Sequence, residues 1–227
     1  MDFERTKEFR DKLLASNVII YDIISNAFEE VDYVIKTLKT SELKEPKTLV
    51  LLSSVLTWVN TPAKFTEAKA EGDEGEEPEE AEEEEPEDEG EKAEGDIPVD
   101  ENGEPIVRAK PIFFKETDYH LRVPHQDFQH LKTLETLAIS SVTTQPLLRV
   151  HVLCSGIRYG NGERVFHDHF QRAWIQNPAA LPFIGKGDNL MPTIHYNDLA
   201  RLVRRVVIER PRVHPYIFAI DKTVRPT

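Results

Sequence analysis

Glycine is scarce where a nucleotide-binding fold would need it. The chain has 227 residues and 10 glycines, and none of these precedes Gly72. It contains no G-x-x-G-x-x-G run, the glycine-rich turn that brings the backbone close to a pyrophosphate at a helix N-terminus. It also lacks the phosphate-binding loop G-x-x-x-x-G-K-[ST], which Gly185-Lys186-Gly187 does not match. We therefore predict no nucleotide cofactor and no P-loop phosphoryl transfer within these residues.

Cysteine and long hydrophobic runs are almost absent as well. Cys154 is the single cysteine, which excludes an internal disulfide and suits a reducing compartment. No stretch reaches the roughly 20 apolar residues that cross a membrane. The opening residues, MDFERTKEFRDKL, are charged and helical in pattern, unlike a secretory signal. We expect a soluble intracellular chain with no membrane partner.

Basic residues nearly disappear from one long segment. Between Glu67 and Glu104 there are 21 acidic residues and two lysines, a net charge of −19, so the other residues carry +6 of the total of −13. With almost no bulky apolar side chains, this segment cannot offset the entropy lost on ordering. We predict an acidic, disordered insertion at residues 66–105, between two parts (1–65 and 106–227) of one domain. A solvated surface insertion is the simpler explanation, and attraction of a basic partner is the alternative.

Three apolar runs without polar alternation have the pattern of strands buried on both faces, as in parallel sheets. They are Val18–Ile24, the start of Thr48–Trp58, and Leu147–Leu153. Leu181–Gly187 and Tyr216–Ile220 are further strand candidates, and helices are predicted at Thr6–Ser16, from Phe28, at Asp127–Val142, at Val165–Ile175 and up to Val207. This order predicts an α/β fold with a doubly wound parallel sheet.

The first of these runs predicts a sheet that is incomplete. Val18–Ile24 is apolar throughout and so is expected in the sheet interior, yet only one helix precedes it. An exposed apolar sheet edge promotes aggregation. We infer that the sheet lacks its first strands, either because the sequence is a fragment or because another polypeptide completes it beside Val18–Ile24.

Two further clusters of side chains are candidates for a functional site. Phe166, Phe170 and Trp174 recur at about one helical turn and are expected in the core, while His167 and His169 point to different helix faces and do not form a metal site. A basic patch of possible use in docking an acidic partner comprises Arg201, Arg204, Arg205, Arg210 and Arg212. A solvated helix face is the other interpretation. Nucleic acid is not expected, because no aromatic residues interleave with the arginines.

Three features resemble the extended short-chain dehydrogenase/reductase family, which includes the NAD-dependent epimerases and dehydratases. These are Ser53-Ser54 followed by Trp58, the run Gly156-Ile157-Arg158-Tyr159-Gly160, and the run PFIGKGDNLMPTIHYNDLARLV with His195 and Asp198. More closely, the chain resembles the epimerase-like region of the ciliary adenylate kinase 7 group. The stretches concerned are Leu13–Ile24, Leu49–Trp58, Phe114–Tyr119 and Phe166–Leu199. This resemblance implies a Rossmann-like fold and residence in the axoneme of a cilium or flagellum.

The family's reaction needs a tyrosine that gives or takes a proton, a lysine four residues later, and a serine. Ser54 matches the serine. Counting back from Glu135, which fits the glutamate after the family's Tyr-x-x-x-Lys motif, Asp127 stands at the tyrosine position and Leu131 at the lysine position. An ionised aspartate has no proton to give, and leucine cannot lower a pKa. The resemblance therefore implies no catalytic, cofactor-binding or metal-binding residues in this chain.

Three functions follow as hypotheses. The first is a non-catalytic, epimerase-like interaction module (a pseudoenzyme) that binds other axonemal proteins in a radial spoke or the central apparatus. The second is a working NAD(P)-dependent epimerase or reductase, completed by upstream sequence. The third is a fragment of an adenylate kinase whose kinase domain lies outside these residues. The pair Asp127 and Leu131 favours the first over the second.

Overall fold

The computed structural model describes residues 3–65, 111–162, 164–176, 191–209 and 214–221. Its helices are α1 (Phe3–Ala15), α2 (Phe28–Thr40), α3 (Gln129–Ser141), α4 (His167–Ile175) and α5 (Tyr196–Glu209), with 3₁₀ turns η1 (Val55–Trp58), η2 (Glu116–Leu121) and η3 (Gln126–Phe128). Its strands are β1 (Val18–Asp22), β2 (Lys47–Ser54), β3 (Lys64–Phe65), β4 (Pro111–Ile112), β5 (Leu148–Ser155), β6 (Ile157–Tyr159), β7 (Thr193–His195) and β8 (Tyr216–Ala219). Within these ranges, no helix combines the length and apolarity that a bilayer crossing requires.

Four parallel strands form the main sheet in the order β1-β2-β5-β8. The central pair is the longest, because β2 and β5 are apolar runs of eight residues that pair along their whole length. Smaller pairs are formed by β6 with β7 in parallel and by β3 with β4 in antiparallel orientation. The predicted α/β fold with a parallel sheet is confirmed.

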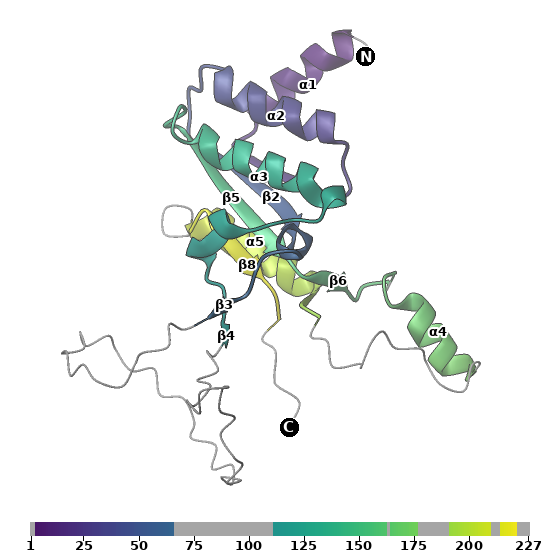
Figure 1. The fold of residues 1–227 in the computed structure, drawn as a ribbon. Coiled ribbons are helices and arrows are strands. Elements are labelled where there is room, and N and C mark those ends of the chain that lie inside the picture. Colours follow the sequence, from purple (N-terminus) through teal and green to yellow (C-terminus); the bar gives the residue numbers. More distant parts are fainter. Residues whose placement is uncertain (1–2, 66–110, 163, 177–190, 210–213, 222–227) are drawn as a thin grey trace, which may run out of the picture. The chain divides into compact units, whose positions relative to one another are not determined.

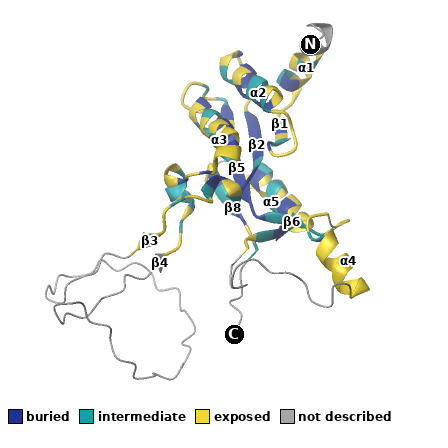
Figure 2. Ribbon diagram, turned by 45° about the vertical axis from the view of Figure 1, so that its right-hand side comes forward, coloured by how far each residue is buried: buried dark blue, intermediate teal, exposed yellow. Residues whose placement is uncertain are grey.

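Helices cover both faces of this sheet, which makes it doubly wound. On one face, α2 and α3 bury apolar residues such as Val34 and Leu134 against Leu49 and Val152 of the central strands. On the other face, α5 packs through Leu199 and Val206, which join the same cluster as Val50 and Leu153. Figure 1 shows α2 and α3 lying side by side along the strands, and Figure 2 shows that β2 and β5 are buried between the helical layers. The strand runs therefore lack polar alternation because both of their faces are covered.

The first strand has one neighbour in the sheet. Within the part of the chain that the structure describes, β1 pairs with β2 alone, and no strand lies on the side where the sequence predicts a missing one. Ile19 and Ile23 are buried, whereas Ile20 is 48% exposed. Alternate residues of this apolar run therefore differ in burial. The side chains of Ile19 and Ile23 lie in the core, whereas α5 does not cover the side chain of Ile20.

The aromatic residues of α4 contradict their prediction. Phe170 is exposed and Trp174 is 89% exposed, so they are not core residues. No residue of α4 is buried, and Figure 2 shows the helix as exposed along its length. The helical spacing was correct, but spacing does not say whether another element packs on the apolar face. The predicted strand Leu181–Gly187 lies outside the described residues.

The chain divides into two compact units, residues 1–62 with 115–227, and residues 63–114. The first unit holds the main sheet and all five described α-helices, and the second contains the β3–β4 pair. Residues 66–110 are not described. The insertion at 66–105 and its boundaries therefore stay a prediction.

Candidate functional site

Two serines end β2 and point to opposite faces of the sheet. Ser54 accepts a hydrogen bond from the backbone N–H of Leu56 at 3.3 Å and so caps the 3₁₀ turn η1. Its carbonyl oxygen accepts the hydroxyl of Thr57 at 3.0 Å. Ser54 is itself buried. The serine that the family resemblance singled out is therefore engaged in ending the strand and starting the turn.

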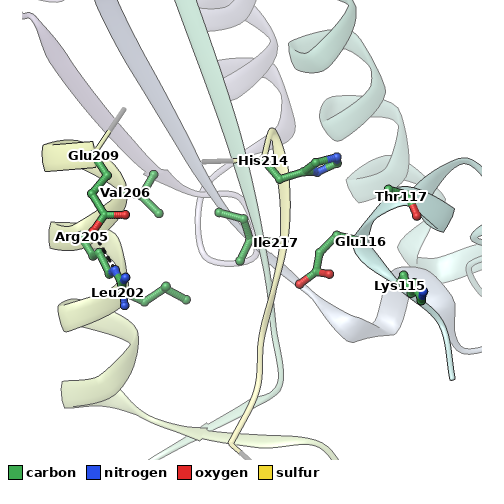
Figure 3. Close-up of a pocket in the computed structure, with 9 residues that line it drawn as sticks. All are labelled: Lys115, Glu116, Thr117, Leu202, Arg205, Val206, Glu209, His214 and Ile217. Atoms are coloured by element: carbon green, nitrogen blue, oxygen red, sulfur yellow. Dashed lines mark hydrogen bonds and ion pairs between the residues drawn. The ribbon is translucent and has the colours of Figure 1, made fainter. Parts of the chain in front are cut away.

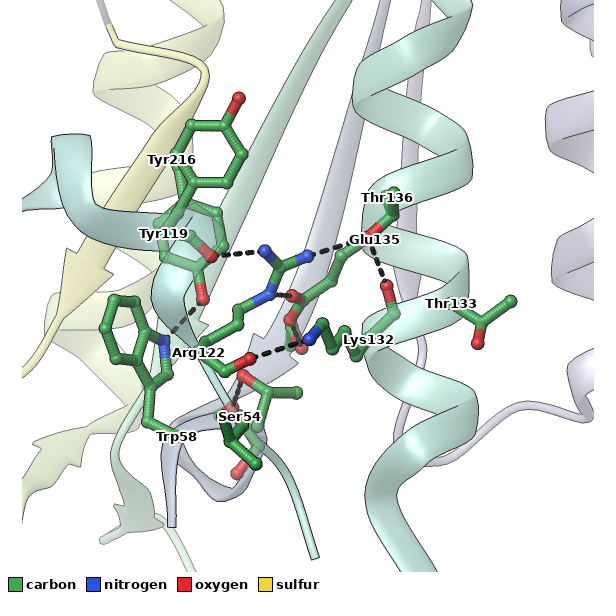
Figure 4. A network of polar contacts seen from close by, with 12 residues as sticks. Ser54, Trp58, Tyr119, Arg122, Lys132, Thr133, Glu135, Thr136 and Tyr216 are labelled. Carbon is green, nitrogen blue, oxygen red and sulfur yellow. Dashed lines mark hydrogen bonds and ion pairs between the residues drawn. The ribbon is translucent and has the colours of Figure 1, made fainter. Parts of the chain in front are cut away.

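Ser53 belongs to a buried ion-pair network on the α3 side. Figure 4 shows the other two members of this network, Arg122 and Glu135. Its hydroxyl donates a short hydrogen bond to Oε1 of Glu135, whose Oε2 accepts Nε–H of Arg122 at 2.6 Å. Both charged side chains are buried. Burial raises the pKa of the Glu135 carboxyl, against the lowering effects of Arg122 and Ser53. A buried charge needs such a partner, because an unpaired one costs several kcal/mol.

Arg122 uses its remaining donors to hold the segment around η2 against α3. It donates a short hydrogen bond to the carbonyl of Tyr119 and another, of 3.0 Å, to the hydroxyl of Thr136. The ammonium group of Lys132 donates to the carbonyl oxygen of Arg122 at 2.7 Å. Arg122 and Lys132 thus connect the segment around η2 to α3 through both backbone and side-chain acceptors.

A cluster of aromatic rings adjoins the guanidinium group. The Cζ atom of Arg122 lies 5.6 Å from the ring centroid of Tyr119 and 5.5 Å from that of Tyr216. These two rings are stacked, with their centroids 5.4 Å apart. Trp58 donates its indole N–H to the Tyr216 hydroxyl at 2.8 Å. Burial raises the pKa of the Tyr216 phenol, and the side chain is inaccessible. This phenol therefore cannot replace the tyrosine of an epimerase as a proton donor to a bound substrate.

Asp127 and Leu131 have unlike environments. The side chain of Asp127 is 77% exposed in η3, where its carboxylate lies 3.3 Å from the His125 ring. Leu131 is only 2% exposed and belongs to the main core cluster. One position is thus open to solvent, while the other faces apolar residues that could not accommodate an ammonium group.

A second polar chain joins the carboxyl ends of β1 and β5. Arg158, which follows β5, donates to the Asp22 carboxylate at 2.5 Å and to the Ser155 hydroxyl at 3.1 Å. Ser155 in turn donates to the carbonyl of Ser53 at 2.7 Å. Burial acts to raise the pKa of Asp22, but the hydrogen bond and charge of Arg158 hold it below its ordinary value. Sequence reasoning missed this pair, although both residues end or follow predicted strands, where polar side chains gather.

The glycine and histidine of the resembling motifs are packing residues. Gly160 has φ of +88°, and a Cβ atom there would lie 2.2 Å from Nε2 of His195. His195 lies on β7, which pairs with β6, and its ring meets Tyr159 edge-on at 5.3 Å. This motif therefore closes a small two-stranded sheet. Gly185 and Gly187 are outside the described residues.

The predicted basic patch is present in part. Arg201, Arg204 and Arg205 are exposed on α5, where Arg201 pairs with Asp198 and Arg205 with Glu209, both at 2.9 Å. Arg210 and Arg212 lie outside the described residues. Each of the two pairs is a surface ion pair, which contributes little to stability and leaves the arginine accessible.

A pocket of about 510 Å³ lies beside this patch, between α5, β8 and η2 (Figure 3). Its apolar floor includes Leu202 and Ile217. Arg205 and Glu209 pair with each other on α5, and Lys115 and Glu116 lie on the opposite side, so the lysine and arginine charges of the lining equal the glutamate charges. This balance favours neither an anionic nor a cationic ligand.

Comparison with known proteins bears on the predicted resemblance. No family model matches the chain. The chain is similar to adenylate kinase 7 of Mus musculus. The two sequences are 26% identical over 212 residues, which is 92% of this chain but only 28% of the mouse protein. Adenylate kinase 7 of Macaca fascicularis is 38% identical over 74 residues, 33% of this chain and 14% of that protein. The predicted resemblance to the adenylate kinase 7 group is confirmed.

One solved structure was also found. Human epimerase family protein SDR39U1 with NADPH is 15% identical, with a TM-score of 0.49, and the match covers 94% of this chain and 61% of that chain. The fold assignment rests on the strand order and helix layers of the chain itself. The chain spans less than a third of the mouse relative, so the activity of that whole protein does not pass to these residues directly.

Proposed function

We propose that this chain is a non-catalytic interaction module of a ciliary or flagellar axonemal assembly, with the scaffold of an epimerase. The observation that supports this most is the environment of Leu131, a core residue at the position where the family requires a lysine. Ser54 is committed to a backbone turn, and Tyr216 is the buried phenol nearest to the network. A proton-transfer pair would have to be assembled from groups that already hold the fold together.

Calorimetric titration of the purified chain with NAD⁺, NADP⁺ and NADPH tests this proposal. We expect no saturable heat, and no change in nicotinamide absorbance when hydroxyl or keto substrates are added. An active epimerase run in parallel verifies that the cofactors are competent. Saturable binding in the micromolar range, together with turnover, would show that the chain is an NAD(P)-dependent enzyme.

The similarity to adenylate kinase 7 supports a second candidate function. Here the chain is one region of a longer polypeptide, and phosphoryl transfer occurs elsewhere in that polypeptide. We expect no conversion of ADP to ATP and AMP by the isolated chain, because no phosphate-binding loop is present in its sequence. Conversion by the isolated chain at rates typical of a kinase would contradict both candidates.

We propose the exposed arginines of α5 as one contact of this module with a partner protein. Arg201, Arg204 and Arg205 offer positive charge on a helix whose other face is fixed in the core. An acidic protein surface is the complementary partner. Charge on a rigid element is well suited to orient such a partner during association.

A further inference from the structure

Charge is divided unevenly along this chain. The segment from Glu67 to Glu104, called the acidic tract below, has 21 acidic residues and two lysines, a net charge of −19. The total is −13, so the residues outside the tract carry +6. Opposite charges on one chain attract each other wherever they come within about 8–10 Å at physiological ionic strength. The acidic tract is therefore attracted to a basic surface of its own chain.

The outer face of α5 is such a surface. Its exposed arginines are Arg201, Arg204 and Arg205, called the arginine face below. The side chains of Arg201 and Arg205 are 81% and 73% exposed, although each has a carboxylate partner on the same helix. Arg204 makes no ion pair with any residue that the structure describes. Exposed ion pairs contribute little to stability, so these arginines can exchange one carboxylate for another at little cost.

Both ends of the segment that contains the acidic tract are attached beside η2. The main unit stops at Pro62 and resumes at Lys115. On the outgoing side, the N–H of Val123, just after η2, donates to the hydroxyl of Thr61 at 2.9 Å. On the returning side, Lys115 lines the same pocket as Arg205, from the opposite wall (Figure 3). The returning end therefore lies across one pocket from the arginine face.

The length of the chain brings the arginine face within reach of the tract. Residues 105–114 connect Glu104 to Lys115, and at up to about 3.3 Å per residue they can bridge roughly 30 Å. The whole of α5, with 14 residues, is only about 21 Å long. A segment tethered in this way acts at an effective concentration of the order of millimolar. The chain's own tract is thus favoured over that of a second copy at micromolar concentration.

We propose that the acidic tract of the same chain occupies the arginine face of α5 and competes there with an acidic partner. Its glutamates pair with Arg204 and, by exchange with Asp198 and Glu209, with Arg201 and Arg205. This inference rests on the proposed function, because the arginine face is the surface proposed above for partner binding. The tract lowers the apparent affinity of this face for any acidic ligand. It thereby reserves the face for partners that make further contacts.

Paramagnetic relaxation in the NMR spectrum of the whole chain tests where the tract lies. The substitution Gly90→Cys provides an attachment point for a spin label within the tract, and Cys154 does not react because it is completely buried. We expect the label to broaden the amide signals of residues 201–205 at low salt. At about 1 M salt, where charges are screened beyond about 3 Å, the broadening should disappear. Absence of broadening on α5 at low salt overturns the proposal.

Matched charge reversals separate a specific contact from general attraction. The double variant Arg201→Glu/Arg204→Glu should abolish the broadening. The control Lys7→Glu/Arg10→Glu makes the same change of charge at two exposed positions of α1 and should leave the broadening intact. An equal effect of both double variants overturns the proposal.

A mixed sample distinguishes the chain's own tract from that of a second copy. It contains spin-labelled chains without isotope and isotope-labelled chains without a spin label. We expect no broadening of the α5 signals in this mixture. Broadening as strong as in the singly prepared sample would show that the tract of a second copy occupies the arginine face, which also overturns the proposal.

Competition is measured with a neutral-tract variant, in which Gln or Asn replaces every Glu and Asp of residues 67–104. If the native tract occupies the arginine face about nine-tenths of the time, this variant binds a fluorescein-labelled polyglutamate peptide about tenfold more tightly at low salt. The gain should be lost when Arg201→Glu/Arg204→Glu is added. Equal affinity of the native and neutral-tract chains overturns the competition. A gain that persists in the combined variant does so as well, because it reflects long-range repulsion alone.

The outcome is separable from that of the cofactor titration. If the chain binds and turns over NADPH while the α5 signals are still broadened, the proposed function fails and the occupation of the arginine face stands. If no cofactor binds and the α5 signals are not broadened, the proposal for the tract alone fails.

Discussion

Arg122 and Glu135 form a buried ion pair, with Nε and Oε2 2.6 Å apart, between the segment that follows η2 and the middle of α3. Ser53, at the end of β2, supplies the other hydrogen bond to the same carboxylate. One charge pair thus joins three segments that are distant in sequence. The carboxyl edge of the sheet, where open α/β folds bind small molecules, carries structural contacts at Ser53.

The first prediction concerns this pair. Arg122→Ala should lower the free energy of unfolding by about 3–5 kcal/mol, because Glu135 is left as an uncompensated buried charge. Urea denaturation followed by circular dichroism measures the loss. Arg201→Ala is the matched control, since the Arg201 side chain is 81% exposed and should change stability by only about 0.5 kcal/mol. Similar losses in both variants would contradict the structural role of the pair.

Substitution should be costly at only one of the two positions Asp127 and Leu131. Leu131→Lys places a charge in the core and is expected to lower the free energy of unfolding by about 3 kcal/mol or more. Asp127→Tyr alters an exposed side chain and should change stability by less than about 0.5 kcal/mol. Thermal unfolding of the two single variants checks this contrast. A stable Leu131→Lys variant would mean that the position is accessible, and the case against catalysis would weaken.

The Asp22–Arg158 pair predicts a pH dependence of stability. The pKa of Asp22 is lowered in the folded chain, so the folded state favours the ionised form more than the unfolded state does. Its stabilising contribution is present above the ordinary aspartate pKa of about 3.9 and is lost as pH falls through the lower folded value. Denaturation of the native chain and of Asp22→Asn between neutral and acidic pH tests this. The stability difference between them should shrink toward low pH, and a constant difference would refute the assignment.

The arginines of α5 predict salt-dependent binding of acidic ligands. The double variant Arg201→Glu/Arg204→Glu should bind a polyglutamate peptide about tenfold more weakly than the native chain at low salt, and the difference should vanish at high salt. Arg10→Glu, on the exposed side of α1, is the control for a general change in net charge. Fluorescence anisotropy provides the measurement. An equal effect of Arg10→Glu would show that the patch on α5 is not a specific surface.

Much of the fold could be predicted because burial of a strand or helix face determines the pattern of apolar and polar residues along that segment. The runs at Leu49–Leu52 and Leu148–Ser155 lack alternation since helices cover both faces, and these segments are indeed the central strands. The helical spacing of α2 and α3 follows from one apolar face, as Leu134 illustrates. The sequence also predicts that no glycine-rich turn is present, because phosphate binding by such a turn requires glycines at fixed spacing along the chain.

The candidate site could be predicted only in outline. Ser54, Asp127 and Leu131 were found through a resemblance, but their present roles as turn cap, exposed carboxylate and core residue became visible only in the structure. Arg122 was not singled out at all. Nothing in the sequence around it distinguishes a buried guanidinium group from a solvated one.

The sequence by itself determined the order of helices and strands, the parallel character of the sheet and the lack of a phosphate-binding turn. Only the tertiary structure decided that Ile20 is half exposed, that Trp174 is exposed and that Arg122 meets Glu135. The physical reason is that the spacing of apolar residues within a segment reflects which of its own faces are buried and which meet solvent. Edges and charge pairs depend instead on which distant segments become neighbours, and that is fixed when the whole chain packs.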